Sequence, residues 1–126
     1  MEMEVRRLLQ NNNIEFIQQF RAEWLGRKSL DFYLPEYKLG IECQGEQHFR
    51  TVPFHGIKDE KVLEENLEKL QKRDRKKREQ CLAKGIQILY FCTNGETTDE
   101  YELIRTSEEL LSKILEYGKD SKNLEN

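Results

Sequence analysis

The spacing of apolar residues changes along the chain, and it predicts helices and strands in a mixed order. Val5, Leu8 and Leu9 recur at helical spacing. Shorter and denser apolar runs are typical of strands. The predicted helices cover 2–10, 59–84 and 106–117, one strand starts at 14, and further strands cover 28–34, 38–44 and 86–92. The order α-β-β-β-α-β-α predicts an α/β fold with a mixed central sheet flanked by helices.

Local signals mark the ends of the two later helices. Asp59 is a favourable N-cap for the long helix, and Gly85 follows its last turn. The segment 106–109 reads Thr-Ser-Glu-Glu, which is the pattern of a capping box. Segment 45–58 contains proline and glycine, so it predicts an ordered loop between a strand and the long helix.

The two strands over 28–34 and 38–44 alternate apolar and polar residues, and the short connection between them predicts an antiparallel hairpin. Successive side chains of a strand point to opposite faces. One predicted face carries Leu30, Phe32, Leu34, Leu39, Ile41 and Cys43. The other, polar face carries Asp31, Glu42 and Gln44, and pairing of the strands brings the two carboxylates together.

Two carboxylates held side by side repel each other unless a cation joins them. Ligation by oxygen alone suits Mg²⁺ or Mn²⁺, and such an ion lowers the pKa of a bound water. Asp31 and Glu42 are therefore candidate metal ligands. The competing interpretation is an ordinary polar face of a half-exposed hairpin, which is common in sheets.

Two further features lie near this pair in the predicted fold. His48 follows Gly45 at the end of the acidic strand, and it is either a proton carrier at a metal site or a surface histidine. Asp74 and Lys77 interrupt the apolar stripe of the long helix, so their side chains are expected to point toward the sheet. A salt bridge between these two residues on adjacent turns is the alternative.

Composition restricts the class of protein. The 126 residues suit one domain, predicted over 1–118 with a polar, disordered tail over 119–126. No segment has the length and hydropathy of a membrane span, and the N-terminus lacks the apolar core of a signal peptide, so we expect a cytoplasmic protein without a membrane partner. The first helix begins without a capping signal, which indicates a domain cut from a longer protein.

Cysteine usage and charge narrow the chemistry further. Cys43, Cys81 and Cys92 are far apart, which argues against a structural zinc site, and all three are interpreted as small apolar residues. The net charge of −3 is unlike that of most non-specific DNA binders. Local field matters more than net charge, however, and the long helix carries a basic cluster that predicts contacts with DNA phosphates or a solvated face: Lys72, Arg73, Arg75, Lys76 and Arg78.

The segments 30–37 and 41–49, with Asp74, Lys77 and the strand over 85–91, resemble the PD-(D/E)xK nuclease superfamily. More narrowly, they resemble the branch related to very-short-patch repair endonucleases and phage homing-type endonucleases. The resemblance covers most of the chain, and its hairpin part is fairly specific. It implies a restriction-endonuclease-like fold and hydrolysis of phosphodiester bonds by metal-activated water.

The resemblance also implies roles for single residues. Asp31 and Glu42 are the metal carboxylates, and the backbone carbonyl of Cys43 is a further metal ligand. Family members often carry an acid on the first helix, for which Glu2 is the first candidate and Glu4 the rival. His48 matches the histidine of the glycine-containing loop.

One position departs from the family pattern. Gln44 stands where a lysine usually lies, and glutamine supplies hydrogen bonds but no positive charge. Either Gln44 suffices together with the metal, or Lys77 supplies the charge from the long helix, or activity is lost. Gln44, His48 and Lys77 are therefore candidate catalytic residues with the two carboxylates.

Three functions remain open from the sequence. The first is a Mg²⁺- or Mn²⁺-dependent endodeoxyribonuclease, and the second is an inactive nuclease-fold module that binds DNA without cutting it. The third is a small oligomerisation or scaffold domain. A cation held between Asp31 and Glu42 would separate the first function from the third.

Overall fold

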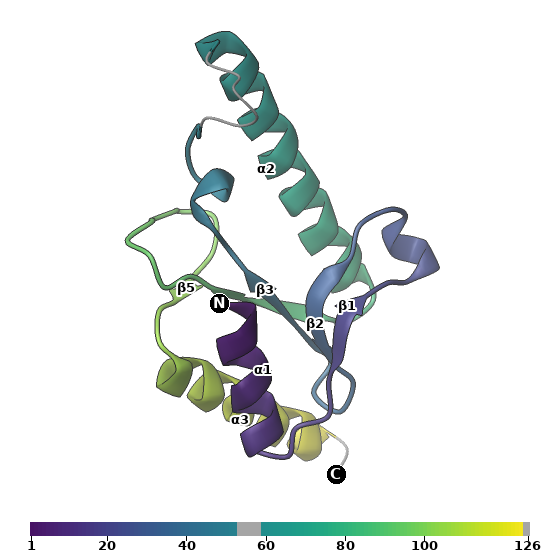
Figure 1. The fold of residues 1–126 in the computed structure, drawn as a ribbon. Helices are drawn as coiled ribbons and strands as arrows, with labels where there is room; N and C mark the ends of the chain where they lie inside the picture. The colour runs from purple at the N-terminus through teal and green to yellow at the C-terminus, as the bar shows by residue number, and fades with distance from the viewer. Residues whose placement is uncertain (53–58, 125–126) are drawn as a thin grey trace.

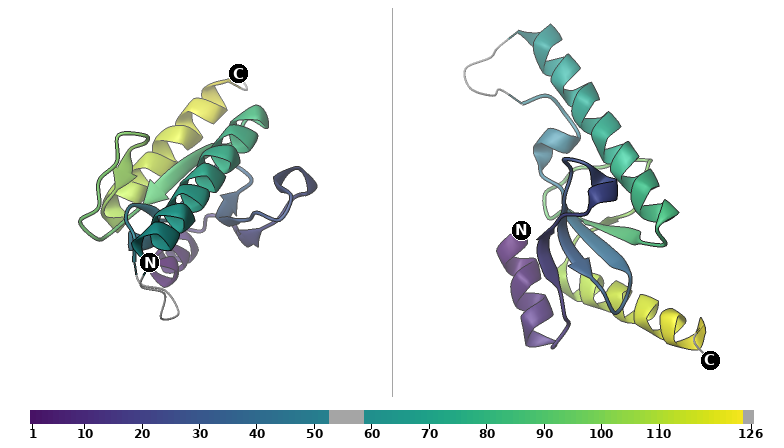
Figure 2. Two further views of the ribbon diagram at one scale, coloured as in Figure 1. Left: turned by 90° about the horizontal axis from the view of Figure 1, so that it is seen from above. Right: turned by 90° about the vertical axis from the view of Figure 1, so that its right-hand side faces the viewer.

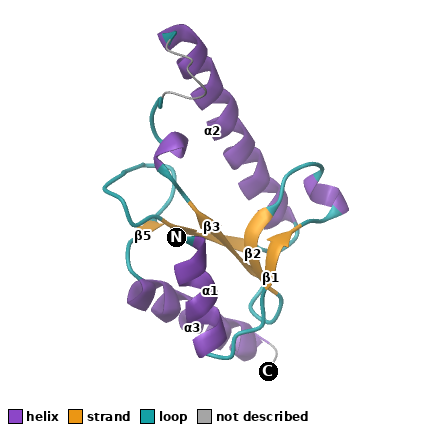
Figure 3. Cartoon of the chain, in the orientation of Figure 1, coloured by secondary structure: helices purple, strands orange, loops and turns teal. Residues whose placement is uncertain are grey.

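A computed structural model describes residues 1–52 and 59–124 of the chain, and it shows a mixed α/β fold (Figure 1). The helices are α1 (Glu2–Asn11), α2 (Glu60–Ala83) and α3 (Ser107–Leu124). The strands are β1 (Ile17–Phe20), β2 (Leu30–Leu34), β3 (Leu39–Cys43), β4 (Gln87–Phe91) and β5 (Leu103–Ile104), with short 3-10 turns η1 (Glu23–Leu25) and η2 (Glu46–His48). Figure 3 shows the same elements coloured by type.

The five strands form one mixed sheet in the order β1-β2-β3-β4-β5. The predicted antiparallel hairpin is present as β2 and β3, which pair from Leu34 and Leu39 at the turn to Phe32 and Ile41. β3 and β4 are parallel, and so are β4 and β5. The strand β5 was missing from the predicted order, because two residues are too few to show a periodicity.

Helices cover both faces of the sheet, with α1 and α3 on one side and α2 on the other (Figures 1 and 2). The larger core joins α1 and α3 to the sheet, and its fully buried members include Val5, Phe32, Ile41, Phe91 and Ile114. A second cluster lies on the side of α2 and contains Leu25, Leu30, Cys81, Ile86, Ile88 and Tyr90. Apolar burial on both faces is typical of parallel strands within a sheet.

The polar face predicted for the hairpin is therefore covered by α2 and not exposed. One apolar residue of the hairpin, Leu30, also lies on the face opposite to the predicted one. Leu30 packs in the cluster beside α2, whereas Phe32 packs in the larger core. Gly40 provides the space, because a Cβ atom there would lie 3.0 Å from Leu30 Cδ1. The prediction that Leu30 shares a face with Phe32 was wrong for this reason.

Both ends of α2 agree with the predicted signals, whereas in α3 only the first end does. The Asp59 side chain accepts a hydrogen bond from the Lys61 backbone N–H (2.9 Å), and Gly85 follows the helix with a φ of +75°, as predicted. Thr106 caps α3 by accepting a hydrogen bond from the Glu109 N–H (3.2 Å). α3 continues beyond its predicted end at 117, and a Cβ atom at Gly118 would collide with the ring of Tyr37.

Other boundaries also moved. The first strand begins at Ile17 rather than at 14, after a turn in which Asn13 has a φ of +53°. The expected polar tail over 119–126 falls mainly within α3, and residues 125–126 lie outside the described part of the chain. Of the loop expected over 45–58, the part over 53–58 is also outside it. In residues 1–52 and 59–124, no helix has the length and hydropathy to cross a membrane.

The packing of α3 can be tested with two identical substitutions on neighbouring turns. Leu110 is fully buried in the larger core, whereas Leu115 is 47% exposed. Leu110→Ala removes buried methyl groups and leaves a cavity, so we expect a loss of about 2–5 kcal/mol in the free energy of unfolding. Leu115→Ala should change it by less than about 1 kcal/mol. Urea denaturation measures both values, and equal losses would contradict the orientation of α3.

Candidate functional site

The strands β2 and β3 separate just beyond the pair Phe32 and Ile41, and there two carboxylates replace the backbone ladder. The Asp31 backbone N–H donates to Glu42 Oε2 (3.0 Å), and the Cys43 backbone N–H donates to Asp31 Oδ2 (2.8 Å). Each carboxylate thus accepts a hydrogen bond from the opposite strand, which holds both side chains at the end of the hairpin. The two predicted metal carboxylates therefore lie side by side at the end of the hairpin, in a pocket that both α1 and α2 help to line.

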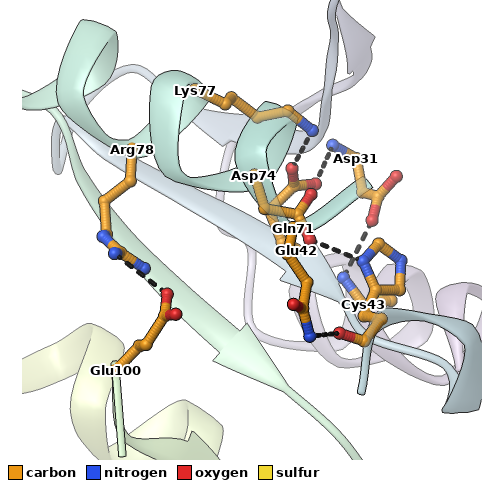
Figure 4. Close-up of polar contacts among 9 residues, drawn as sticks. Asp31, Glu42, Cys43, Gln71, Asp74, Lys77, Arg78 and Glu100 are labelled. Atoms are coloured by element: carbon orange, nitrogen blue, oxygen red, sulfur yellow. Dashed lines mark hydrogen bonds and ion pairs between the residues drawn. The ribbon is translucent and has the colours of Figure 1, made fainter. Parts of the chain in front are cut away.

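Lys77 of α2 reaches this pair and forms an ion pair with Glu42 Oε1 (Figure 4). Glu42 is only 5% exposed, and burial raises its pKa to about 7, although the charge of Lys77 opposes this shift. Asp31 adds to the increase by repulsion between the two carboxylates. The site therefore concentrates negative charge that Lys77 compensates only in part.

Gln44 follows on β3 and is almost completely buried, with 2% of its surface exposed. In the described part of the chain its Oε1 atom has no hydrogen-bond donor. A buried amide oxygen without a partner costs free energy, and it is a suitable ligand or acceptor for a bound group. Gln44, Asp31, Glu42 and Lys77 line one pocket of about 230 Å³.

His48 lies in the turn η2 and lines the same pocket. Its Nδ1 atom is 2.8 Å from Oδ2 of Asp74, whose side chain is largely buried. Gln71 fixes the turn by donating from Nε2 to the His48 carbonyl (3.2 Å). Asp74 therefore pairs with His48, and the alternative of a salt bridge between Asp74 and Lys77 was wrong. When the Nδ1–H donates to Asp74, the Nε2 atom of His48 remains as a proton acceptor.

The two candidate acids of the first helix have different positions. Glu2 lines the pocket, and burial together with the neighbouring Asp31 carboxylate raises its pKa. Glu4 instead accepts a hydrogen bond from the Ser107 hydroxyl (2.9 Å). Of the two, Glu2 is the acid near the carboxylate pair.

Cys43 also lines the pocket. Burial raises the pKa of its thiol to about 12, so the thiol of the metal-free protein is protonated at neutral pH. Cys81 and Cys92 are buried and free, in agreement with their interpretation as small apolar residues.

The five cations predicted to bind DNA do not act as one group. Arg78 forms an ion pair with Glu100 (3.4 Å; Figure 4), and so does Arg75 (3.1 Å). The Arg78 guanidinium also lies over the ring of Tyr101. Lys72, Arg73 and Lys76 line a separate groove with Arg27, Lys28 and Lys69. The sequence interpretation missed the last three cations, although Lys69 continues the helical spacing of Lys72 and Arg73.

The residues fit a divalent cation in part. Among the described residues, no three His, Cys, Asp or Glu side chains form a cluster that could hold a metal alone. Asp31, Glu42 and Gln44 nevertheless line one pocket, and side-chain oxygens of these types suit Mg²⁺ or Mn²⁺. Because Lys77 already contacts Glu42, full use of that carboxylate by a cation requires the ammonium group to move aside.

No protein-family model matches the sequence, and a search of curated proteins finds no match. The geometry and chemistry of this pocket are therefore the basis on which function is inferred.

The raised pKa of Glu42 predicts how stability depends on pH in the metal-free protein. The folded pKa of about 7 exceeds the ordinary value of 4.5, so folding favours protonated Glu42. Its contribution to stability is fully present below about pH 4.5 and is lost as pH rises through about 7. When the pH rises from 5.5 to 8.5, we expect the free energy of unfolding of wild type to fall by roughly 2 kcal/mol more than that of Glu42→Gln, because glutamine does not titrate.

Thermal unfolding in EDTA at both pH values measures this difference. Exposed Glu64→Gln is the matched control, and its pH dependence should equal that of wild type. A Glu42→Gln variant with the full wild-type pH dependence would show that Glu42 does not titrate in this range.

Proposed function

We propose that this chain is a Mg²⁺- or Mn²⁺-dependent endonuclease of the PD-(D/E)xK type, with a restriction-endonuclease-like fold, that hydrolyses DNA phosphodiester bonds. The observation that supports it most is the pairing of Asp31 and Glu42 at the open end of the β2–β3 hairpin. A structural role alone would be served more cheaply by apolar residues at this buried place. A divalent cation, when bound, supplies positive charge to the phosphate and acidifies water.

The residues around the carboxylates have complementary roles in hydrolysis. A water oxygen forms the new bond to phosphorus, and the bond from phosphorus to the leaving sugar oxygen breaks. His48 Nε2 accepts the proton of the attacking water, while Asp74 holds the ring through Nδ1. Lys77 supplies positive charge near the phosphate in place of the lysine that β3 lacks, and the leaving oxygen takes its proton from solvent.

One contact favours a second function, an inactive nuclease-fold module that binds DNA. Lys77 forms an ion pair with Glu42, so this carboxylate already has a counter-charge. If the ion pair is permanent, the pocket neither needs nor accepts a divalent cation. The two functions differ in whether the chain binds a divalent cation and cleaves DNA.

The metal carboxylates can be tested by substitutions that keep their shape. Asp31→Asn and Glu42→Gln remove the charges that hold the cation, so each should lower Mg²⁺-dependent cleavage of plasmid DNA by roughly 100-fold. Exposed Asp99→Asn is the control and should cleave as wild type does. Calorimetry with Mn²⁺ gives a second measurement, because both site variants should lose metal binding. A wild-type chain that binds DNA but neither Mn²⁺ nor Mg²⁺ would support the inactive module instead.

The roles of Lys77 and Gln44 lead to a separate experiment. Lys77→Met should reduce the cleavage rate by roughly 100-fold and change DNA affinity by less than about 3-fold, because the lysine acts mainly on the transition state. Gln44→Lys should retain or raise activity, since it places a cation just after β3. Exposed Lys61→Met on the same helix is the control. Single-turnover kinetics and DNA titrations separate rate from affinity, and equal losses of both in Lys77→Met would reject this role.

A further inference from the structure

A groove beside α2 is lined by six residues, and every one of them is a lysine or an arginine. Its volume is about 390 Å³, and its lining consists of Arg27, Lys28, Lys69, Lys72, Arg73 and Lys76. The chain as a whole has a net charge of −3, so this concentration of positive charge is local.

Two elements build the groove. Lys69, Lys72, Arg73 and Lys76 are spaced three and four residues apart, so they form one stripe along α2. Arg27 and Lys28 belong to the segment between η1 and β2, and η1 packs against α2. A hydrogen bond from Gln80 Nε2 to the Trp24 carbonyl (3.1 Å) holds the two elements together one turn beyond the stripe.

The positive charges of the groove are not explained by ion pairs within the described residues. Among the side chains described in residues 1–52 and 59–118, none of the six cations forms an ion pair, whereas Arg75 and Arg78 on another face of the same helix pair with Glu100. Six like charges that line one groove repel each other, which lowers stability. An anion with several charges would relieve this repulsion.

The groove also lies close to the carboxylate pocket. Arg73 is one helical turn before Lys77, a rise of about 6 Å along α2. Lys28 is three residues before Asp31 on the segment that continues into β2, a span of about 10 Å when extended. Because one strand of DNA rises 3.4 Å per nucleotide, this span corresponds to about three nucleotides.

We propose that the groove binds consecutive phosphates of a DNA strand on one side of the phosphate that enters the carboxylate pocket. The inference rests on the proposed function for the choice of DNA. It adds to that function the path of the DNA strand and three cations that the predicted cluster did not include, which are Arg27, Lys28 and Lys69. An anionic membrane fits less well, because surface-bound helices insert an apolar face and this lining is wholly cationic.

The test measures binding of a fluorescent 20-base-pair duplex in EDTA, where no cleavage interferes, at salt concentrations from 50 to 200 mM. Lys72→Gln/Lys76→Gln removes two phosphate contacts, so its affinity should fall about 10-fold or more, and its slope of log affinity against log salt should flatten by about 2. Arg27→Gln should flatten the slope by about 1. The matched control is Arg6→Gln/Arg7→Gln, which removes two exposed cations from α1 and should keep the wild-type slope.

Three outcomes have separate meanings when circular dichroism shows that all variants are folded. Loss of affinity in the groove variants alone supports the groove, even if wild type cleaves no DNA and the nuclease proposal fails. Equal loss in the control shows a general charge effect and overturns the groove, whether or not wild type cleaves DNA. Groove-dependent binding to phosphatidylserine vesicles without groove-dependent DNA binding also overturns it and assigns the surface to a membrane.

Discussion

The parallel pairing of β3 and β4 determines where the functional side chains meet. A parallel neighbour is not reached by a tight turn, so the chain must cross over through α2 before it returns as β4. The 24 residues of α2 extend for about 36 Å, which is roughly twice the length of a five-residue strand. The helix therefore projects beyond the sheet at its beginning and packs against β4 near its end (Figure 2). This crossing brings Asp74 and Lys77 to the point where β2 and β3 separate.

The pairing of Asp31 with Glu42 could be predicted, because it depends on strand alternation and on a short hairpin turn. Both signals are local, and they require only that the register keeps the two residues opposite. The direction of Asp74 and Lys77 toward the sheet also follows from their positions in the apolar stripe of α2. The general α/β class, the N-cap at Asp59 and the end of α2 near Gly85 follow from equally local patterns.

The partners within the site could not be predicted in the same way, because they join residues far apart in sequence. Spacing along one helix indicated a contact between Asp74 and Lys77. In the structure, however, each of the two side chains pairs with a residue of another element. Asp74 meets His48 across 26 positions, and Lys77 meets Glu42 across 35. The side change of Leu30 has a similar origin, because it depends on space above Gly40 on the neighbouring strand.

Two adjacent faces of α2 lie in environments of opposite charge. Lys77 faces the buried carboxylates, and the next stripe faces outward with its cations unpaired among the described residues. Three carboxylate side chains line the pocket, those of Glu2, Asp31 and Glu42, whereas, among the described residues, Lys77 is the one lysine or arginine in its lining. The groove, in contrast, carries an excess of positive charge. Under the proposed function, a phosphate strand in the groove and a cation in the pocket would compensate the two excesses, so the binding of each would favour the binding of the other.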